Sequence, residues 1–304
     1  MSTQIKTVAL SGASGALGTA LLHALLEANF TVTALTRSDS TATFPSSVEI
    51  AKVNYQDTSS LQAALNGQDA VISTVGYAGI LGQEKLIDAA IAAGVKRILP
   101  SEYGSDPRNA NARALPVFGH KVQIEHHLKR ACEASGGKTS WTMVCNNEFF
   151  DWDLDHSFGV DIKARRMEVF DGGDVPFTAT PLAFVAKGIV SILQRPEQTA
   201  NRVIRLHGTS MTQNRLLSLL QKYTSTSAED WKVQHSSTVE REKEAYEALQ
   251  KNPADFVKWA IMMLQCAVWG TKFGNDFSEE NDNEMLGLKK LSEGEIDEIV
   301  KARC

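Results

Sequence analysis

The stretch GASGALG, residues 12–18, decides the fold. It follows a short apolar run, Thr7 to Leu10, and opens the segment ALGTALLHALLEANF, whose apolar residues recur with a helical period and end near Asn29. A strand, a tight glycine turn and a helix in this order are typical of a dinucleotide-binding βαβ unit.

Each glycine of this turn has its own physical reason. Gly12 permits the sharp turn, Gly15 lets the backbone approach a phosphate, and Gly18 lets the helix pack closely on the sheet. The amide hydrogens at the N-terminus of the helix would then meet the pyrophosphate of a dinucleotide. We therefore predict that the cofactor-binding residues of the turn are Gly12, Ser14, Gly15, Ala16, Leu17 and Gly18.

Strands and helices alternate through the first half of the chain. We expect strands at 7–10, 31–36, 48–53, 69–75, 95–99 and 140–145, and helices between them at 16–29, 61–66, 83–94 and 117–135. This order predicts an α/β fold with an open, parallel, doubly wound sheet of the Rossmann type. We assign 1–150 to the nucleotide-binding domain and 151–304 to a smaller, mostly helical substrate-binding region, with a strand near 202–206 that could return to the first sheet.

The composition argues against several classes of protein. Lys and Arg number 31 against 36 Asp and Glu, a formal charge of −5, which is too acidic for a general binder of nucleic-acid backbones. No run of about eighteen apolar residues predicts a membrane span. The start of the chain lacks the apolar run of a signal peptide, and no CxxC pair occurs, so we expect a cytoplasmic protein with reduced thiols. No metal site is predicted, because no His, Cys, Asp and Glu cluster has ligand spacing.

The end of the second expected strand indicates the cofactor. NAD-binding proteins usually place an acidic residue there, and this sequence has Thr36-Arg37-Ser38. The Arg37 guanidinium can pair with a 2′-phosphate, which favours NADPH and NADP. Asp39 lies two residues further on and could argue for NAD.

A lysine is the candidate acid–base group. Short-chain dehydrogenases on this scaffold usually carry Tyr-x-x-x-Lys, but none of the five tyrosines has a lysine four positions later. Lys121 still lies in the helix after the fifth expected strand, where its ammonium would come near the nicotinamide ribose and could donate or accept a proton. His120 and the pair His126-His127 are alternative acid–base groups.

Together these motifs resemble the NmrA-like, atypical short-chain dehydrogenase family, which includes isoflavone, pinoresinol–lariciresinol and phenylcoumaran benzylic ether reductases. The resemblance covers about residues 5–205 and rests on GASGALG, AVISTVG (70–76), QEKLIDAAIAAGVKRILPSEYG (83–104) and Phe118-x-x-Lys121-x-x-Ile124. It implies that Lys121 is the general acid or base beside the cofactor, that Thr74, Val75 and Gly76 line the cofactor, and that Arg37 contacts the 2′-phosphate. It also places Pro100-Ser101-Glu102 at the border of this site. The C-terminal portion is more similar to fungal members.

The stretch after the sixth expected strand occupies the family's substrate-contact region. We predict that Asn147, Phe149, Phe150 and Trp152 contact the substrate, with Phe158 nearby and the helix that bears Trp259, Met262, Met263 and Trp269 as a lid. The favoured function is an NADPH-dependent reductase that transfers hydride to an aromatic or phenolic small molecule in secondary metabolism. Two alternatives stay open: an NADP-binding isomerase or cyclase without net redox change, and a redox-sensing regulator that binds dinucleotide without turnover. The apolar helix 259–269 could instead join two copies in a homodimer.

Overall fold

The protein folds into two compact units. A computed structural model describes residues 4–304. The first unit comprises the chain up to Tyr103 together with His120–Val144 and Leu182–Ile204, and the second comprises Gly104–Gly119, Cys145–Pro181 and Arg205–Cys304. The units therefore alternate along the chain, and the functional division at residue 150 stays a prediction.

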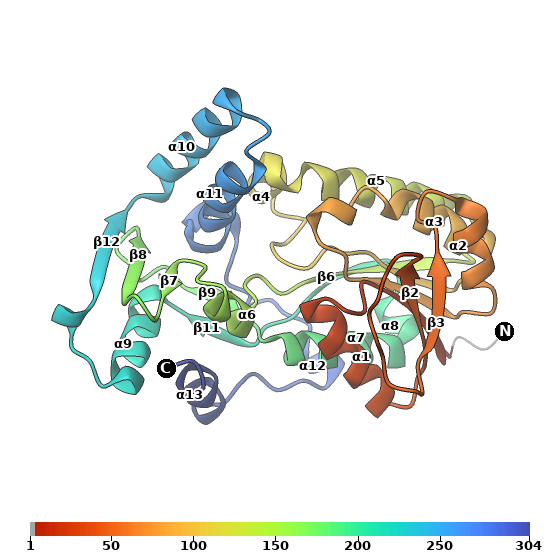
Figure 1. The fold of residues 1–304 in the computed structure, drawn as a ribbon, viewed down its shortest axis with the longest axis horizontal. Coiled ribbons are helices and arrows are strands. Elements are labelled where there is room, and N and C mark those ends of the chain that lie inside the picture. The colour runs from red at the N-terminus through yellow and green to blue at the C-terminus, as the bar shows by residue number, and fades with distance from the viewer. Residues whose placement is uncertain (1–3) are drawn as a thin grey trace. The chain divides into compact units, whose positions relative to one another are not determined.

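A seven-stranded sheet organises the first unit, in the order β10-β6-β5-β4-β1-β2-β3 (Figure 1). Every neighbouring pair from β6 to β3 is parallel, and Leu10 of β1 lies between Ala34 of β2 and Ile72 of β4. This confirms the predicted doubly wound sheet, and the strand expected near 202–206 joins it at the edge. The strands are β1 (Thr7–Ser11), β2 (Thr31–Arg37), β3 (Glu49–Val53), β4 (Ala70–Ser73), β5 (Arg97–Leu99), β6 (Ser140–Cys145) and β10 (Arg202–Arg205).

Helices cover both faces of this sheet (Figure 1). One face carries α1 (Ala16–Glu27), which packs against α7 (Leu182–Gln194), and the other carries α2 (Thr58–Leu65), α3 (Gln83–Ala92) and α5 (Gly119–Ala134). Because both faces are covered, β1 and β4 are almost wholly buried, which explains their continuous apolar sequences TVALS and AVIS. The short helix α8 (Pro196–Thr199) precedes the edge strand.

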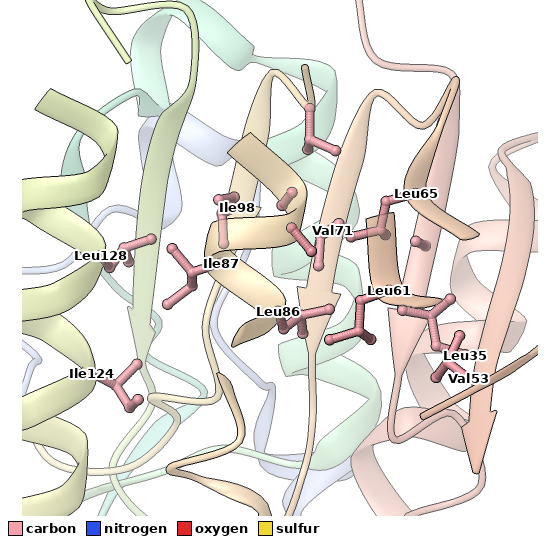
Figure 2. Packing of buried hydrophobic residues seen from close by; sticks show 14 of the residues in the cluster. Leu35, Val53, Leu61, Leu65, Val71, Leu86, Ile87, Ile98, Ile124 and Leu128 are labelled. Atoms are coloured by element: carbon pink, nitrogen blue, oxygen red, sulfur yellow. The ribbon is translucent and has the colours of Figure 1, made fainter. Parts of the chain in front are cut away.

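Apolar side chains fill the space between the sheet and α2, α3 and α5 (Figure 2). Leu61 and Leu65 of α2 face Val71 of β4, and Ile87 of α3 and Leu128 of α5 extend the same cluster; each is at most 1% exposed. Full burial of such a side chain stabilises the fold by roughly 1.5–3 kcal/mol. The packed sheet is thus a rigid base for the loops at the carboxyl ends of its strands.

The second unit combines helices with two small sheets. The helices are α4 (Ala110–Ala114), α6 (Phe150–Asp155), α9 (Gln213–Thr224), α10 (Thr238–Lys251), α11 (Phe256–Trp269), α12 (Asn283–Leu286) and α13 (Glu293–Lys301). The sheets pair β11 (Thr209–Met211) with β9 (Phe177–Ala179), and β8 (Arg166–Phe170) with both β7 (Val160–Asp161) and β12 (Lys232–Ser236). These five strands were not predicted, because runs of two to five residues carry little periodicity.

Candidate active site

A cavity of about 390 Å³ lies at the carboxyl ends of β1, β2 and β4. The strand order reverses direction at β1 and β4, and such a switch point is where open α/β sheets bind ligands. Four of the predicted cofactor residues line this cavity, namely Gly12, Ser14, Arg37 and Val75. The first unit therefore brings the glycine turn, the end of β2 and the loop after β4 around one space.

The glycine turn is fixed by close backbone contacts. Gly12 has φ +83°, and a Cβ there would lie 2.8 Å from the carbonyl group and Oγ1 of Thr74. The Thr74 hydroxyl donates to the carbonyl oxygens of Ser11 and Gly12, at 3.1 Å each. A Cβ on Gly18 would lie 2.0 Å from the Gly12 oxygen, so α1 can start against the turn only with glycine at this position. Gly15 is less constrained, and its approach to a phosphate stays a prediction.

The N-terminus of α1 is suited to an anion. Its N-cap, Gly15, offers no side chain to the first amide groups, and the first turn holds no acidic residue. The positive end of the helix dipole is thus not neutralised by the helix's own side chains. In the same cavity the buried hydroxyls of Thr36 and Ser73 have no hydrogen-bond partner among residues 4–304. These features fit the diphosphate and ribose groups of a dinucleotide.

The end of β2 provides a cation, and the segments before and after β3 provide aromatic rings. Three-quarters of the Arg37 side chain is exposed, and its Nε lies 3.7 Å from Oδ1 of the equally exposed Asp39. Such a surface ion pair is weak, so Arg37 can turn to a 2′-phosphate at little cost. Phe44 and Tyr55 line the cavity beside it and were not predicted. The Tyr55 hydroxyl shares a 2.8 Å hydrogen bond with Ser11 Oγ and donates to the Leu35 carbonyl, and burial raises its pKa. No sequence motif marks these two rings.

Lys121 lies in the first turn of α5, the helix after β5, as expected. Its half-buried amine donates to the carbonyl oxygens of Glu102 and Tyr103, both at 2.7 Å. These acceptors fix the direction of the amine. His120 stacks on Tyr77, with ring centroids 5.0 Å apart, and Nε2 of His127 lies 2.7 Å from an Asp88 oxygen on α3.

Several predicted cofactor residues lie outside the lining of this cavity. They are Gly15, Ala16, Leu17, Gly18, Thr74, Gly76 and Lys121. Gly15 and its three followers form the start of α1, while Thr74 and Gly76 belong to the loop after β4. Their contact with a cofactor stays a prediction.

The predicted substrate residues belong to the second unit, where they have different surroundings. Asn147 adopts φ 53°, is 5% exposed, and donates from Nδ2 to the Thr178 carbonyl at 3.0 Å. Phe149 is partly buried, but Phe150 is only 1% exposed and belongs to the hydrophobic core of this unit. Trp152 is 37% exposed and stacks on His156. Packing in this core is sufficient to explain the burial of the Phe150 side chain.

The helix expected to act as a lid, α11, is a core helix of the second unit. Trp259, Met263 and Trp269 are at most 6% exposed. The Trp269 ring packs on the rings of Phe158 and Phe170, with centroids 5.2 Å away in both cases. A lid role is not supported, because these side chains already have partners. Met262 is partly buried at the same helix.

Within residues 4–304, no three His, Cys, Asp or Glu side chains are grouped so that they could hold a metal ion. No helix in that range has both the length and the apolar character needed to cross a membrane.

Comparison with known proteins identifies the family. The sequence model of the NmrA-like family matches residues 4–252. The chain belongs to the NmrA-like family. This NmrA-like protein is 32% identical to oxidoreductase poxI of Penicillium oxalicum over 93% of its own length and 90% of the relative. It is also 32% identical to oxidoreductase aprR of Aspergillus flavus, over 96% and 97% of the two chains. The predicted family resemblance is thereby confirmed.

Several solved structures share this fold. A structure from a study of pinoresinol–lariciresinol and phenylcoumaran benzylic ether reductases superposes with a TM-score of 0.76, covering 98% of this chain and all of that one, at 18% identity. AtPrR2 with NADP+ and (+)pinoresinol gives a TM-score of 0.73 at 18% identity, with complete coverage of both chains. At this identity the likeness establishes the fold.

Proposed function

We propose that this NmrA-like protein is an NADPH-dependent reductase that transfers hydride to an aromatic or phenolic small molecule. One observation carries the proposal: a single unit holds both the cavity at the switch point of the sheet and an oriented lysine in the helix after β5. The names of the fungal relatives, both oxidoreductases at 32% identity over almost the whole chain, support the same class of reaction.

The residues of the first unit fit NADPH. The Gly12 turn and the start of α1 would hold the diphosphate, and Arg37 would hold the 2′-phosphate. Thr74, Val75 and Gly76 would line the nicotinamide side, since they continue β4 at the switch point. NADPH supplies a hydride when it is bound.

Lys121 would act as the general acid or base. Its ammonium is directed by two carbonyl oxygens and can donate a proton to a substrate oxygen, directly or through a water molecule. Neither a catalytic metal nor a Tyr-x-x-x-Lys pair is part of this proposal.

The aromatic nature of the substrate is supported by relatives of this fold. One structural neighbour, AtPrR2, is a complex with NADP+ and (+)pinoresinol, an aromatic compound, and a place in secondary metabolism is part of the same proposal. Asn147, Phe149, Phe150 and Trp152 stay the predicted substrate residues. The Asn147 amide oxygen has no hydrogen-bond partner among residues 4–304, and Trp152 is 37% exposed, so these two have the most direct support. A cytoplasmic location and a homodimer stay predictions as well.

Removal of the Lys121 amine tests the proposal. Lys121→Ala should lower turnover about 100-fold or more, the contribution of a lost acid–base group, while NADPH affinity changes by less than about threefold. Calorimetric titration with NADPH, NADP and NADH measures binding, and loss of the nicotinamide absorbance with phenolic alkenes, ethers and quinones measures turnover. Lys129→Ala is the matched control, since Lys129 lies on the same helix and pairs with Glu125 at 2.6 Å.

Two outcomes would contradict the proposal in different ways. An unchanged rate in Lys121→Ala would remove Lys121 from the mechanism. Tight NADPH binding without oxidation by any compound would exclude the reductase for these substrates and favour the isomerase, the cyclase or the redox-sensing regulator. Product analysis at constant NADPH would then separate an isomerase or cyclase from the regulator.

A further inference from the structure

The loop between β4 and α3 contacts the cofactor cavity along much of its length. Val75, Gly79 and Gly82 line the cavity, and so does Gln83, the first residue of α3. The loop includes the short 3-10 helix Tyr77–Gly79. The loop therefore forms one wall of the space that a ligand in the cavity would occupy.

The Gln83 side chain joins this loop to the end of β5. Gln83 is 2% exposed. Its Nε2 donates to the Ile80 carbonyl at 3.2 Å, and its Oε1 accepts from the backbone N–H of Ser101 at 2.8 Å. Because both ends of this buried amide are used, its position is strongly determined.

Ser101 forms a second connection between the same two segments. Its hydroxyl donates to the Val75 carbonyl at 2.8 Å, and its side chain is almost fully buried. The next peptide closes a tight turn, since the Glu102 N–H donates to the Pro100 carbonyl at 2.9 Å. The carbonyls of Glu102 and Tyr103, directly after Ser101, are the two acceptors of the Lys121 amine.

A ring contact links the loop to α5 as well. Tyr77 stacks on His120, the residue before Lys121, with 22° between the ring planes. The loop is thus attached both to the segment that holds the lysine amine and to the helix that carries the lysine. All these contacts lie within the first unit.

We propose that Gln83 and Ser101 are positioning residues that couple occupancy of the cofactor cavity to the orientation of the Lys121 amine. A ligand that presses on the loop moves or stiffens Gln83 and Val75, and the two hydrogen bonds to Ser101 pass this constraint to the Glu102 and Tyr103 carbonyls. An effect of this coupling on catalysis rests on the proposed function. The effect on the orientation of the Lys121 amine does not.

The test uses a ligand that fills only part of the cavity. Adenosine 2′,5′-bisphosphate carries the adenosine and 2′-phosphate of NADPH and has no nicotinamide, so it can affect Lys121 only through the protein. In the full chain, the rate at which an N-hydroxysuccinimide ester acetylates Lys121 is followed by peptide mass spectrometry, with and without this ligand. Lys96, which pairs with Asp69 at 2.7 Å, is the internal reference in each sample.

The variants separate the coupling from general damage. Ser101→Ala and Gln83→Met each remove a connection, so Lys121 should be acetylated about fivefold faster, the factor expected for losing one ordinary hydrogen bond. The change in the Lys121 acetylation rate that adenosine 2′,5′-bisphosphate causes in wild type should be smaller in both variants. Ser101→Thr keeps the hydroxyl and should restore the wild-type rate. Gln62→Met is the matched control, since Gln62 of α2 donates only a 3.4 Å bond to the Ala92 carbonyl at the surface.

The outcomes distinguish the coupling from the proposed reaction. Equal Lys121 acetylation and an equal ligand response in wild type, Ser101→Ala and Gln83→Met, with unchanged melting temperatures, would overturn the coupling. Faster Lys121 acetylation in the variants of a protein that does not oxidise NADPH with any tested compound would support the coupling and contradict the reductase. Where a substrate is found, the two variants should lower kcat about tenfold with little change in KM, because a misplaced catalytic group affects the chemical step.

Discussion

Two loops leave carboxyl ends of strands in the same sheet and use their residues in opposite ways. After β4, the segment of residues 74–83 lines a cavity with two glycines and the buried amide of Gln83. After β6, the sequence Glu148-Phe149-Phe150-Asp151-Trp152 is rich in aromatic rings, yet Phe150 is directed into the core of the second unit. The loop after β4 lines the candidate cofactor site, whereas at least Phe150 of the aromatic stretch after β6 packs in a hydrophobic core.

The difference shows what each kind of signal reports. A glycine at a tight turn reports a backbone requirement, which only a few environments impose, so Gly12 and Gly18 could be placed from the sequence. An aromatic ring satisfies either a core or a ligand equally well. Its position after a strand therefore does not decide between the two.

The largest expected effect is on stability and separates Phe150 from Trp152. Phe150→Ala should lower the free energy of unfolding by about 3–5 kcal/mol, because it removes a ring from a packed core. Trp152→Ala should lower it by less than about 1 kcal/mol, since Trp152 is partly exposed. Urea unfolding at 25 °C measures both. Similar losses of unfolding free energy in the two variants would show that Phe150 and Trp152 are packed to a similar extent. A loss of kcat/KM confined to Trp152→Ala would support a contact between Trp152 and the substrate.

The sequence predicted the first unit better than the second for a physical reason. The βα repeats have long apolar strands and periodic helices, and β6 begins and ends where expected, at Ser140 and Cys145. The second unit relies on contacts between distant segments, such as the Thr178 hydroxyl that accepts from the Phe277 N–H. Such pairings leave no local pattern. For the same reason Phe44, Tyr55 and Gln83 were missed at the cavity, because only the folded chain brings them to the glycine turn.

A smaller effect tests the cofactor side of the comparison. Arg37→Ala should weaken NADPH binding by roughly 10- to 100-fold, the value of a lost hydrogen bond between charged groups, and leave NADH binding unchanged. Calorimetric titration with both cofactors measures this ratio. Arg166→Ala is the control, because Arg166 is a similarly exposed arginine of the second unit, 4.0 Å from Asp161. Equal loss for NADPH and NADH would mean that Arg37 does not recognise the 2′-phosphate.

The smallest expected effect is a pH dependence of the stability of the fold that arises in the loop after β6. Burial, with a further contribution from Asp151, raises the pKa of the Asp153 carboxyl to about 8, against a hydrogen bond with the Phe149 backbone that lowers it. Burial and the nearby Asp153 likewise raise the pKa of Glu148. An unfolded aspartic acid ionises near pH 4, so between about pH 4 and 8 only the unfolded state has lost this proton. The stability of the fold should therefore decrease across that interval as pH rises.

Asp153→Asn keeps the shape of the side chain and removes its titration. The variant and wild type should melt together near pH 4, and the variant should melt at a higher temperature than wild type at pH 8, because only the wild type then loses stability through this proton. Asp39→Asn, at an exposed aspartate, should show no such trend. A difference between Asp153→Asn and wild type that stays constant with pH would mean that Asp153 is ionised in the folded protein. The loop after β6 would then need a cation or a stronger donor near Asp153, and it would resemble a polar site more than a core.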